Sequence, residues 1–207
     1  MDIIWHGHSC FTLKGEDAMI VTDPYTGLGT TLPKLKAHVV TLGDSHAAAM
    51  KAEVAEVEGN PKLLDWPGEF EVAGVNIEAL PHEQGNIFIF NIDGIKVCHL
   101  AGISSEPSDE TLEHIGDVDV LLIPVGGETV MDAKTAQRLI EAIEPRVVIP
   151  MYFMSGESKM NIQGPSEFLK VVGKSNLEPL DKFTVKGRAG LPEENMEFVL
   201  LEPQLKG

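Results

Sequence analysis

Residues 37–50 read Ala37-His-Val-Val-Thr-Leu-Gly-Asp-Ser-His-Ala-Ala-Ala-Met50, an apolar run that leads directly into a polar, histidine-bearing tip. The segment Val39 to Leu42 is typical of a buried strand, and Gly43 ends it. Side chains just beyond the carboxyl end of a strand project from the following loop, so we expect Asp44 and His46 to lie together. A functional cleft is therefore predicted at this tip.

The chain is strongly acidic. Of its 207 residues, 43% are hydrophobic and 23% are charged, and the formal net charge is -16. This length can bury one large core, which predicts a single domain over residues 1–207. The negative charge excludes non-specific binding to nucleic acid or to an anionic membrane surface. We expect the partner to be a small molecule or a protein, with a homo-oligomer as one form of the latter.

The sequence has no basic and apolar leader at its start, and no apolar run approaches the roughly 18 residues that a spanning helix needs. We therefore expect a cytoplasmic protein. Cys10 and Cys98 each lie in an apolar, strand-like run, which fits two reduced, buried thiols better than a disulfide framework. A single bridge between them is the alternative.

The two halves of the chain follow different patterns. The first half is mostly short strands, with a hairpin turn at Asp93-Gly94 and a strand that stops at Asp23-Pro24. The second half alternates helices and strands, and Ser108 and Asp132 are predicted helix caps. This order predicts the α/β (α+β) class, as a sandwich of sheets with helices on its outer faces.

Five short motifs occur in order along the chain. They are Ile4-Trp5-His6-Gly7-His8-Ser9-Cys10-Phe11, Thr22-Asp23-Pro24, Glu58-Gly59-Asn60-Pro61, Pro67-Gly68-Glu69-Phe70-Glu71-Val72 and Asp119-Val-Leu-Leu-Ile-Pro-Val-Gly-Gly127. Through them, residues 3–153 resemble the metallo-β-lactamase superfamily, in its small stand-alone branch of zinc-dependent hydrolases. The resemblance implies a four-layer αββα sandwich whose metal site lies at one edge of the two sheets, with ligands on strand-end loops.

The resemblance also implies a metal-binding pattern from which this chain departs. Relatives carry His-x-His-x-Asp-His after the strand, where this chain reads Asp44-Ser-His-Ala-Ala-Ala49. In the family pattern, four positions hold the second metal, and here they are occupied by Ala48, Ala49, Gly102 and Tyr152. Alanine and glycine side chains offer no donor atom, so this half of the site is predicted to be lost.

Two function classes follow from this pattern. Asp44, His46 and His82 could hold a single zinc or other divalent ion with open positions, as in a metal-dependent hydrolase. Alternatively, the fold is kept without its chemistry, as a binding or scaffolding protein with no cofactor and no catalytic residue. The joint loss of four donors from one half-site favours the second class.

The other polar residues of this region have structural interpretations. Asp44 is a favoured cap for the alanine-rich segment, and His99 is expected to be a hydrogen-bonded core histidine. Tyr152 is expected to fill the space of the second ion, with its hydroxyl bonded to an adjacent polar group such as Asp23 or His8. The predicted pocket residues are His6, His8, Asp23, His99 and Tyr152.

Overall fold

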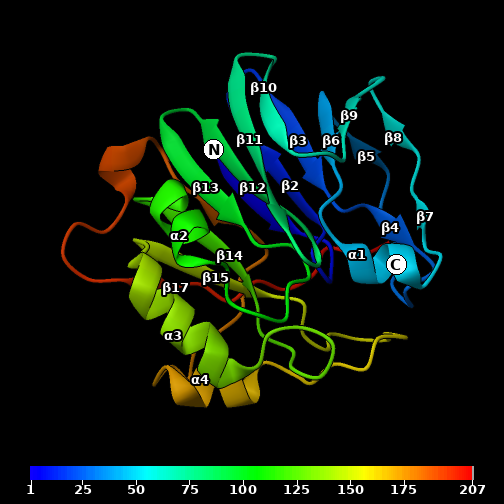
Figure 1. The fold of residues 1–207 in the computed structure, drawn as a ribbon. Helices are drawn as coiled ribbons and strands as arrows, with labels where there is room; N and C mark the ends of the chain where they lie inside the picture. The colour runs from blue at the N-terminus through cyan, green and yellow to red at the C-terminus, as the bar shows by residue number, and fades with distance from the viewer. Residues whose placement is uncertain (207) are drawn as a thin grey trace.

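Two β-sheets face each other in the computed structural model, which describes residues 1–206 (Figure 1). The six-stranded sheet has the order β16-β1-β2-β3-β6-β9, and the seven-stranded sheet has the order β10-β11-β12-β13-β14-β15-β17. The strands of the six-stranded sheet are β1 (Asp2–Trp5), β2 (Phe11–Lys14), β3 (Met19–Thr22), β6 (Val39–Thr41), β9 (Lys62–Leu64) and β16 (Phe183–Thr184). Those of the seven-stranded sheet are β10 (Gly68–Val72), β11 (Val75–His82), β12 (Gly85–Ile92), β13 (Ile95–His99), β14 (Val120–Pro124), β15 (Val147–Met151) and β17 (Glu197–Phe198). Two small pairs join β4 (Tyr25–Thr26) to β7 (Glu53–Val54) and β5 (Leu35–Lys36) to β8 (Val57–Glu58).

Tight hairpins set the register of the first half. Asp93 and Gly94 have φ angles of 53° and 74°, and they close the β12–β13 ladder at the pair Ile92↔Ile95. Positive φ at both central residues matches the twist of the flanking strands, which is why Asp-Gly is favoured there. The hairpin predicted at this dipeptide is confirmed. The six-stranded sheet also contains two parallel pairs, β3 with β6 and β6 with β9, so a first half made of short strands is not purely antiparallel.

Helical crossovers connect the parallel strands β13, β14 and β15. They are α2 (Asp109–Ile115) and α3 (Ala133–Ile143), which Figure 1 shows against the seven-stranded sheet. Ser108 Oγ accepts the amide of Thr111 at 3.2 Å, and the Asp132 carboxylate accepts two amides at the start of α3. Both predicted caps are confirmed. β14 and β15 are buried along their whole length because the core covers one face and helices cover the other.

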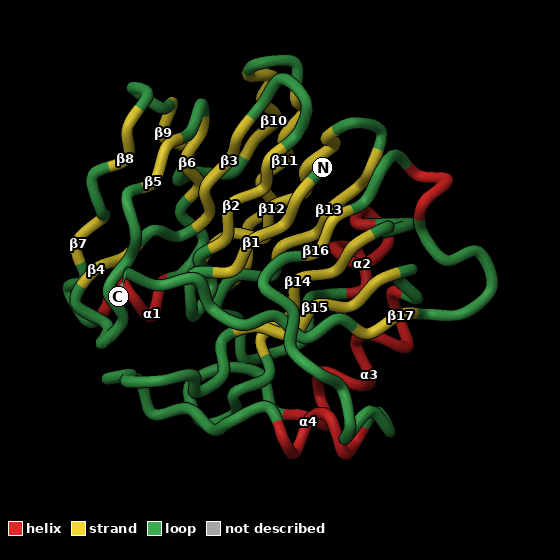
Figure 2. Tube along the Cα trace, turned by 180° about the vertical axis from the view of Figure 1, so that it is seen from behind, coloured by secondary structure: helices red, strands yellow, loops and turns green. Residues whose placement is uncertain are grey.

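The space between the sheets is filled by one continuous apolar core. Trp5 and Phe11 of the first sheet and Phe88 and Phe90 of the second are fully buried in the same cluster. The sandwich predicted from the sequence is confirmed. Figure 2 shows mainly loops and short strands, rather than long helices, over the outer face of the six-stranded sheet. A small separate cluster lies there, formed by Cys10, Val21, Leu35, Ala37 and Val40.

Two short helices complete the architecture. α4 (Ser166–Val171) lies beside α3, and α1 (Ser45–Ala49) lies at one edge of the sandwich, next to the small β4–β7 pair (Figure 1). Within residues 1–206, none of the helices combines the length and apolar character needed to span a bilayer.

Because both sheets contribute to one core, we expect the chain to unfold as a single domain. Thermal or urea unfolding followed by tryptophan fluorescence and by far-ultraviolet circular dichroism should give coincident single transitions. Two separated transitions, or a proteolytic fragment that stays folded, would show instead that the halves fold independently.

Cys10 and Cys98 are both free and buried, with 3% and 0% of their surface exposed. Burial raises the pKa of both thiols, that of Cys98 to about 12. Only the thiolate reacts quickly, so a disulfide reagent should modify neither cysteine in the native protein and both after denaturation. A thiol that reacts at the rate of a free cysteine before unfolding would contradict this arrangement.

Candidate functional site

Three aspartates follow the ends of three neighbouring parallel strands. β3 ends before Asp23, β6 ends three residues before Asp44, and β9 ends before Asp65. The strands run in register, with Thr22↔Thr41 and Thr41↔Leu64 as partners. The carboxyl ends of parallel strands share one edge of the sheet, so the pairing itself brings the three carboxylates to one region.

Asp44 is the central group of this region. Its Oδ1 accepts the backbone amides of His46 at 2.9 Å and Ala47 at 3.3 Å, which confirms its role as the cap of α1. Its Oδ2 accepts the hydroxyl of Tyr152 at 2.7 Å. The side chain is 2% exposed, and burial raises the pKa of this carboxyl. The carboxylate is thus held by three donors of the protein itself.

Asp23 lies directly behind Asp44. Its Oδ1 accepts the amides of Gly43 at 2.6 Å and Asp44 at 3.3 Å. Its Oδ2 is buried and has no hydrogen-bond partner within residues 1–206. Burial, together with the negative charge of Asp44, raises the pKa of Asp23 to about 8. Each of the two buried carboxyl groups therefore makes ionisation of the other more costly.

Tyr152 connects the two sheets at this edge. It follows β15, its amide donates to the carbonyl of His8 at 3.0 Å, and its ring lies edge-on to the His8 ring at 5.5 Å. The Tyr152 hydroxyl bonds to an adjacent polar group, as expected, but that group is Asp44 and not Asp23 or His8, which were named as examples. Packing against His8 fixes the position of the Tyr152 ring. The Asp44 carboxylate, held in place as the cap of α1, lies at the hydroxyl end of that ring. Burial and the nearby Asp44 raise the pKa of Tyr152.

The histidines of the predicted pocket are engaged in separate structural contacts. His6 lies between Thr12 Oγ1 at 2.8 Å and the carbonyl of Gln204 at 2.9 Å. His8 Nε2 contacts Ser158 Oγ at 2.9 Å, and His99 Nε2 contacts the Ser9 carbonyl at 2.9 Å. Burial lowers the pKa of His8 and His99 to about 4, so both rings are neutral at physiological pH. Of the three, His8 contacts the Asp44–Tyr152 pair through Tyr152.

The residues expected to hold a single metal are not grouped together. His82 lies at the end of β11, where Nδ1 accepts the Gln84 amide at 3.2 Å and Nε2 is 3.5 Å from Ser105 Oγ. His46 Nε2 is buried without a hydrogen-bond partner in the part of the chain that the structure describes. Within residues 1–206, no three His, Cys, Asp or Glu side chains are placed so that they could hold a metal ion. The residues present therefore do not fit a metal centre.

Gly102, where the family resemblance implies a bridging carboxylate, lies close to both Asp44 and Tyr152. A Cβ atom placed on Gly102 would lie 2.6 Å from Asp44 Oδ1 and 3.1 Å from Tyr152 Cε2. The first distance is shorter than any van der Waals contact. An aspartate at this position would collide with the hydrogen-bonded pair, so the space is already occupied by Asp44 and Tyr152.

A cleft of about 460 Å³ opens beside α1, and we call it the α1 cleft. Its polar lining comes from Tyr25, Asp44, Ser45, Asp65 and Asn86, and its apolar lining includes Leu42, Ala48, Ala52 and Val54. Of the predicted site residues, only Asp44 lines it. Asp23 and Asp44 were identified as polar residues just past the end of a strand. Asp65 meets the same criterion, but this is recognised only when β9 is placed beside β6.

Comparison with known proteins agrees with this architecture. Residues 2–152 match the family model described as a beta-lactamase superfamily domain. A candidate zinc-dependent hydrolase of the metallo-β-lactamase superfamily from Thermotoga maritima is 31% identical, with a TM-score of 0.81 over 98% of this chain and 99% of that one. A protein named as a metal-dependent hydrolase from Thermoplasma acidophilum is 28% identical over 188 residues, covering 74% of this chain and 83% of its own.

A more distant structure shares the fold alone. Igni18, a metallo hydrolase from Ignicoccus hospitalis, is 18% identical and superposes with a TM-score of 0.63 over 89% of this chain and 99% of its own. The matched family model covers most of the chain, and the resemblance seen in the five motifs is confirmed. This chain belongs to the metallo-β-lactamase superfamily.

The Tyr152–Asp44 hydrogen bond should contribute measurably to stability. Tyr152→Phe leaves a buried carboxylate oxygen without its donor and should lower the free energy of unfolding by about 1–3 kcal/mol. Tyr25→Phe is the matched control, because the Tyr25 hydroxyl has no hydrogen-bond partner within residues 1–206, and it should change stability by less than about 0.5 kcal/mol. Urea unfolding of the three proteins compares them; equal losses for the two variants would contradict this role.

Proposed function

We propose that this chain is a metallo-β-lactamase-fold protein whose metal centre has been replaced by the hydrogen-bonded pair Tyr152–Asp44, which we call the plug. In this proposal it acts as a non-catalytic binding protein. The observation that carries the proposal is the Tyr152–Asp44 pair at 2.7 Å. Both residues stand at positions that supply metal ligands in the family pattern. Here the Tyr152 hydroxyl and Asp44 Oδ2 bond to each other instead. A carboxylate that already accepts three hydrogen bonds from the protein is a weaker ligand for a metal ion than a free carboxylate.

Two further observations support this proposal. Ala48 and Ala49 lie exposed on α1 and bring no donor atom to the site. The space at Gly102 is closed by Asp44 and Tyr152, so the bridging position is filled rather than empty. The two free, buried thiols agree with a reducing compartment such as the cytoplasm.

His46 gives a metal-dependent hydrolase some support as the second candidate. Its Nε2 is buried and unpartnered within residues 1–206, next to the Asp44 cap, and a buried polar atom without a partner is costly. Relatives such as the Thermoplasma acidophilum protein are named as metal-dependent hydrolases. In this alternative, movement of the β11–β12 hairpin would bring His82 to Asp44 and His46.

Metal analysis separates the two candidates. Protein purified without chelator or affinity tag should contain less than about 0.2 zinc, iron or manganese per chain, because a folded site fills stoichiometrically. It should show no chelator-sensitive hydrolysis of phosphodiesters or lactones. One bound ion per chain that is lost in His46→Ala would establish the mononuclear hydrolase instead.

Restoring the family ligands tests the plug directly. Tyr152→His alone should bind no zinc, since one imidazole is far short of a coordination shell. Gly102→Asp alone should be destabilised, because its side chain meets Asp44 and Tyr152. A variant that restores all the family ligands should bind roughly two zinc ions per chain. It combines Ala48→Asp, Ala49→His, Gly102→Asp, Tyr152→His and Asp44→His. Zinc binding by the unmodified protein at the same level would refute the plug.

A further inference from the structure

The α1 cleft contains hydrogen-bond acceptors that the protein does not satisfy. Asn86 Nδ2 donates to the backbone carbonyl of Asp65 at 3.1 Å, which leaves Asn86 Oδ1 as an acceptor on the wall of the cleft. Asp44 Oδ2 accepts only the Tyr152 hydroxyl and has capacity for one more donor. The Asp65 side chain is exposed and forms no salt bridge within residues 1–206.

Tyr25 points to the same cleft from a buried position. Its side chain is 8% exposed, lines the cleft, and its hydroxyl has no hydrogen-bond partner in the part of the chain that the structure describes. Burial raises the pKa of Tyr25, and the charges of Asp23, Asp44 and Asp65 add to the effect. The negative potential of the three strand-end aspartates is therefore felt at the Tyr25 hydroxyl.

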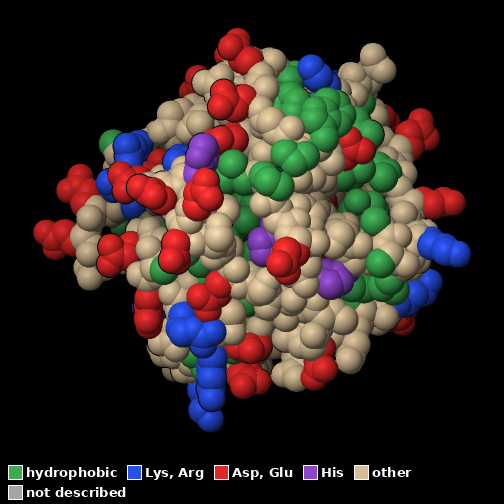
Figure 3. All heavy atoms as spheres, viewed as in Figure 1, with side chains coloured by type: hydrophobic (Ala, Val, Ile, Leu, Met, Phe, Trp, Pro, Cys, Tyr) green, Lys and Arg blue, Asp and Glu red, His purple; other side chains and the backbone are tan. Residues whose placement is uncertain are grey.

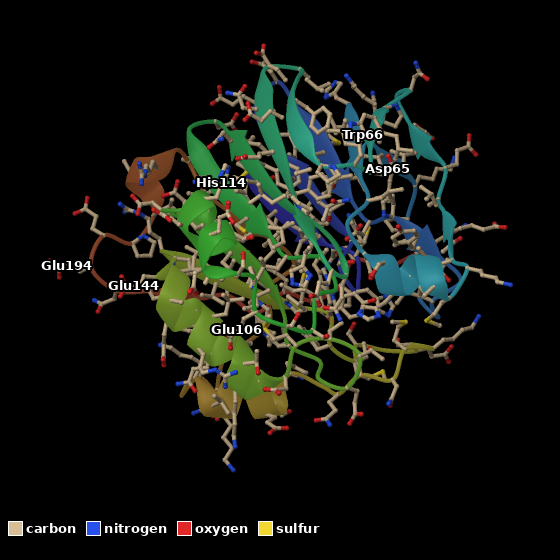
Figure 4. All side chains as sticks on the ribbon, in the orientation of Figure 1. Asp65, Trp66, Glu106, His114, Glu144 and Glu194 are labelled. Carbon is tan, nitrogen blue, oxygen red and sulfur yellow. The ribbon has the colours of Figure 1, made fainter. Side chains whose placement is uncertain are left out.

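No basic side chain balances these carboxylates. None of the described residues that line the cleft is a lysine or an arginine. Figure 4 labels Asp65 on the segment that leaves β9, on the same side of the molecule as α1. Over the whole face seen in Figure 3, acidic side chains outnumber basic ones. Negative potential in a partly desolvated cleft raises the local concentration of cations.

The cleft also has an apolar wall. Leu42, Ala48, Ala52 and Val54 line it, and Val54 is 44% exposed. Ala48 offers only a methyl group at a position where the family pattern has a carboxylate. A volume of about 460 Å³ lies within the range of small-molecule sites. The lining thus combines acceptors and negative charge with an aliphatic surface.

We propose that the α1 cleft binds a small organic cation, namely a primary amine with a short aliphatic body. A primary ammonium carries three N–H donors and no acceptor, which suits the free acceptors of Asp44, Asp65 and Asn86. The aliphatic body covers the wall formed by Leu42, Ala48 and Val54. This inference rests on the proposed function, because a metal ion at Asp44 would use the same carboxylate.

The test titrates the metal-free full chain with n-hexylamine, followed by backbone amide NMR shifts and calorimetry. Saturable shifts should map to the amides of Ser45, Gly85 and Asn86, with a Kd of about 1 mM for a ligand of this size. 1-Hexanol and hexyltrimethylammonium should each bind about tenfold more weakly, since one lacks the charge and the other lacks N–H donors. Binding should weaken as ionic strength rises.

Two variants and a matched control locate the site. Asp65→Asn should weaken n-hexylamine binding about fivefold, the effect of one partly exposed charge, without disturbing the Asn86 bond to the backbone of residue 65. Ala48→Leu should abolish binding by filling the apolar wall. Asp181→Asn makes the same charge change at an exposed position outside the cleft and should leave the Kd unchanged.

Failure of this inference and failure of the proposed function are distinguishable. Absence of saturable shifts in metal-free protein, equal binding of 1-hexanol, or equal effects of Asp65→Asn and Asp181→Asn would overturn the amine site and leave the plugged metal centre intact. Stoichiometric metal bound through Asp44 would overturn both.

Discussion

Parallel pairing of β3, β6 and β9 is the constraint on which the site depends. Antiparallel neighbours would place successive strand ends at opposite edges, whereas three parallel strands in register deliver their following residues to one edge. Asp23, Asp44 and Asp65 meet for this reason. The same edge faces the end of β15 in the other sheet, and Tyr152 crosses the gap to Asp44. The sheet topology therefore determines which residues meet at the site.

Three devices offset the charge that this geometry concentrates. The N-terminal amides of α1 donate to Asp44 Oδ1, the Tyr152 hydroxyl donates to Asp44 Oδ2, and the amides of Gly43 and Asp44 donate to Asp23 Oδ1. Each of these donors places positive potential at short range from a buried carboxyl oxygen. With Asp44 uncapped or Tyr152 removed, a buried carboxylate would remain with too few donors.

The sequence predicted what depends on local signals. The Asp93-Gly94 hairpin, the caps Ser108 and Asp132, and the cap role of Asp44 all follow from residue chemistry within a few positions, and all are present. The hydrogen-bond partner of the Tyr152 hydroxyl depends on how the two sheets are placed relative to each other, and local signals did not identify it as Asp44. Asp65 and Asn86 were missed because the parallel pairing of β6 with β9 has no signal in the sequence. His6 was named as a pocket residue, and its ring lies between Thr12 and the carbonyl of Gln204 in the C-terminal segment.

Backbone strain is concentrated at the site. His8, Asp23, Ala101 and Tyr152 all adopt left-handed φ angles, of 47°, 43°, 50° and 56°. Such conformations cost non-glycine residues of order 1 kcal/mol each, and the buried Asp23–Asp44 pair adds a further cost. Glycine at these positions and an apolar pair in place of the aspartates would relieve both. The left-handed residues and the buried aspartates therefore lower the stability of this edge relative to a purely apolar packing of the same region.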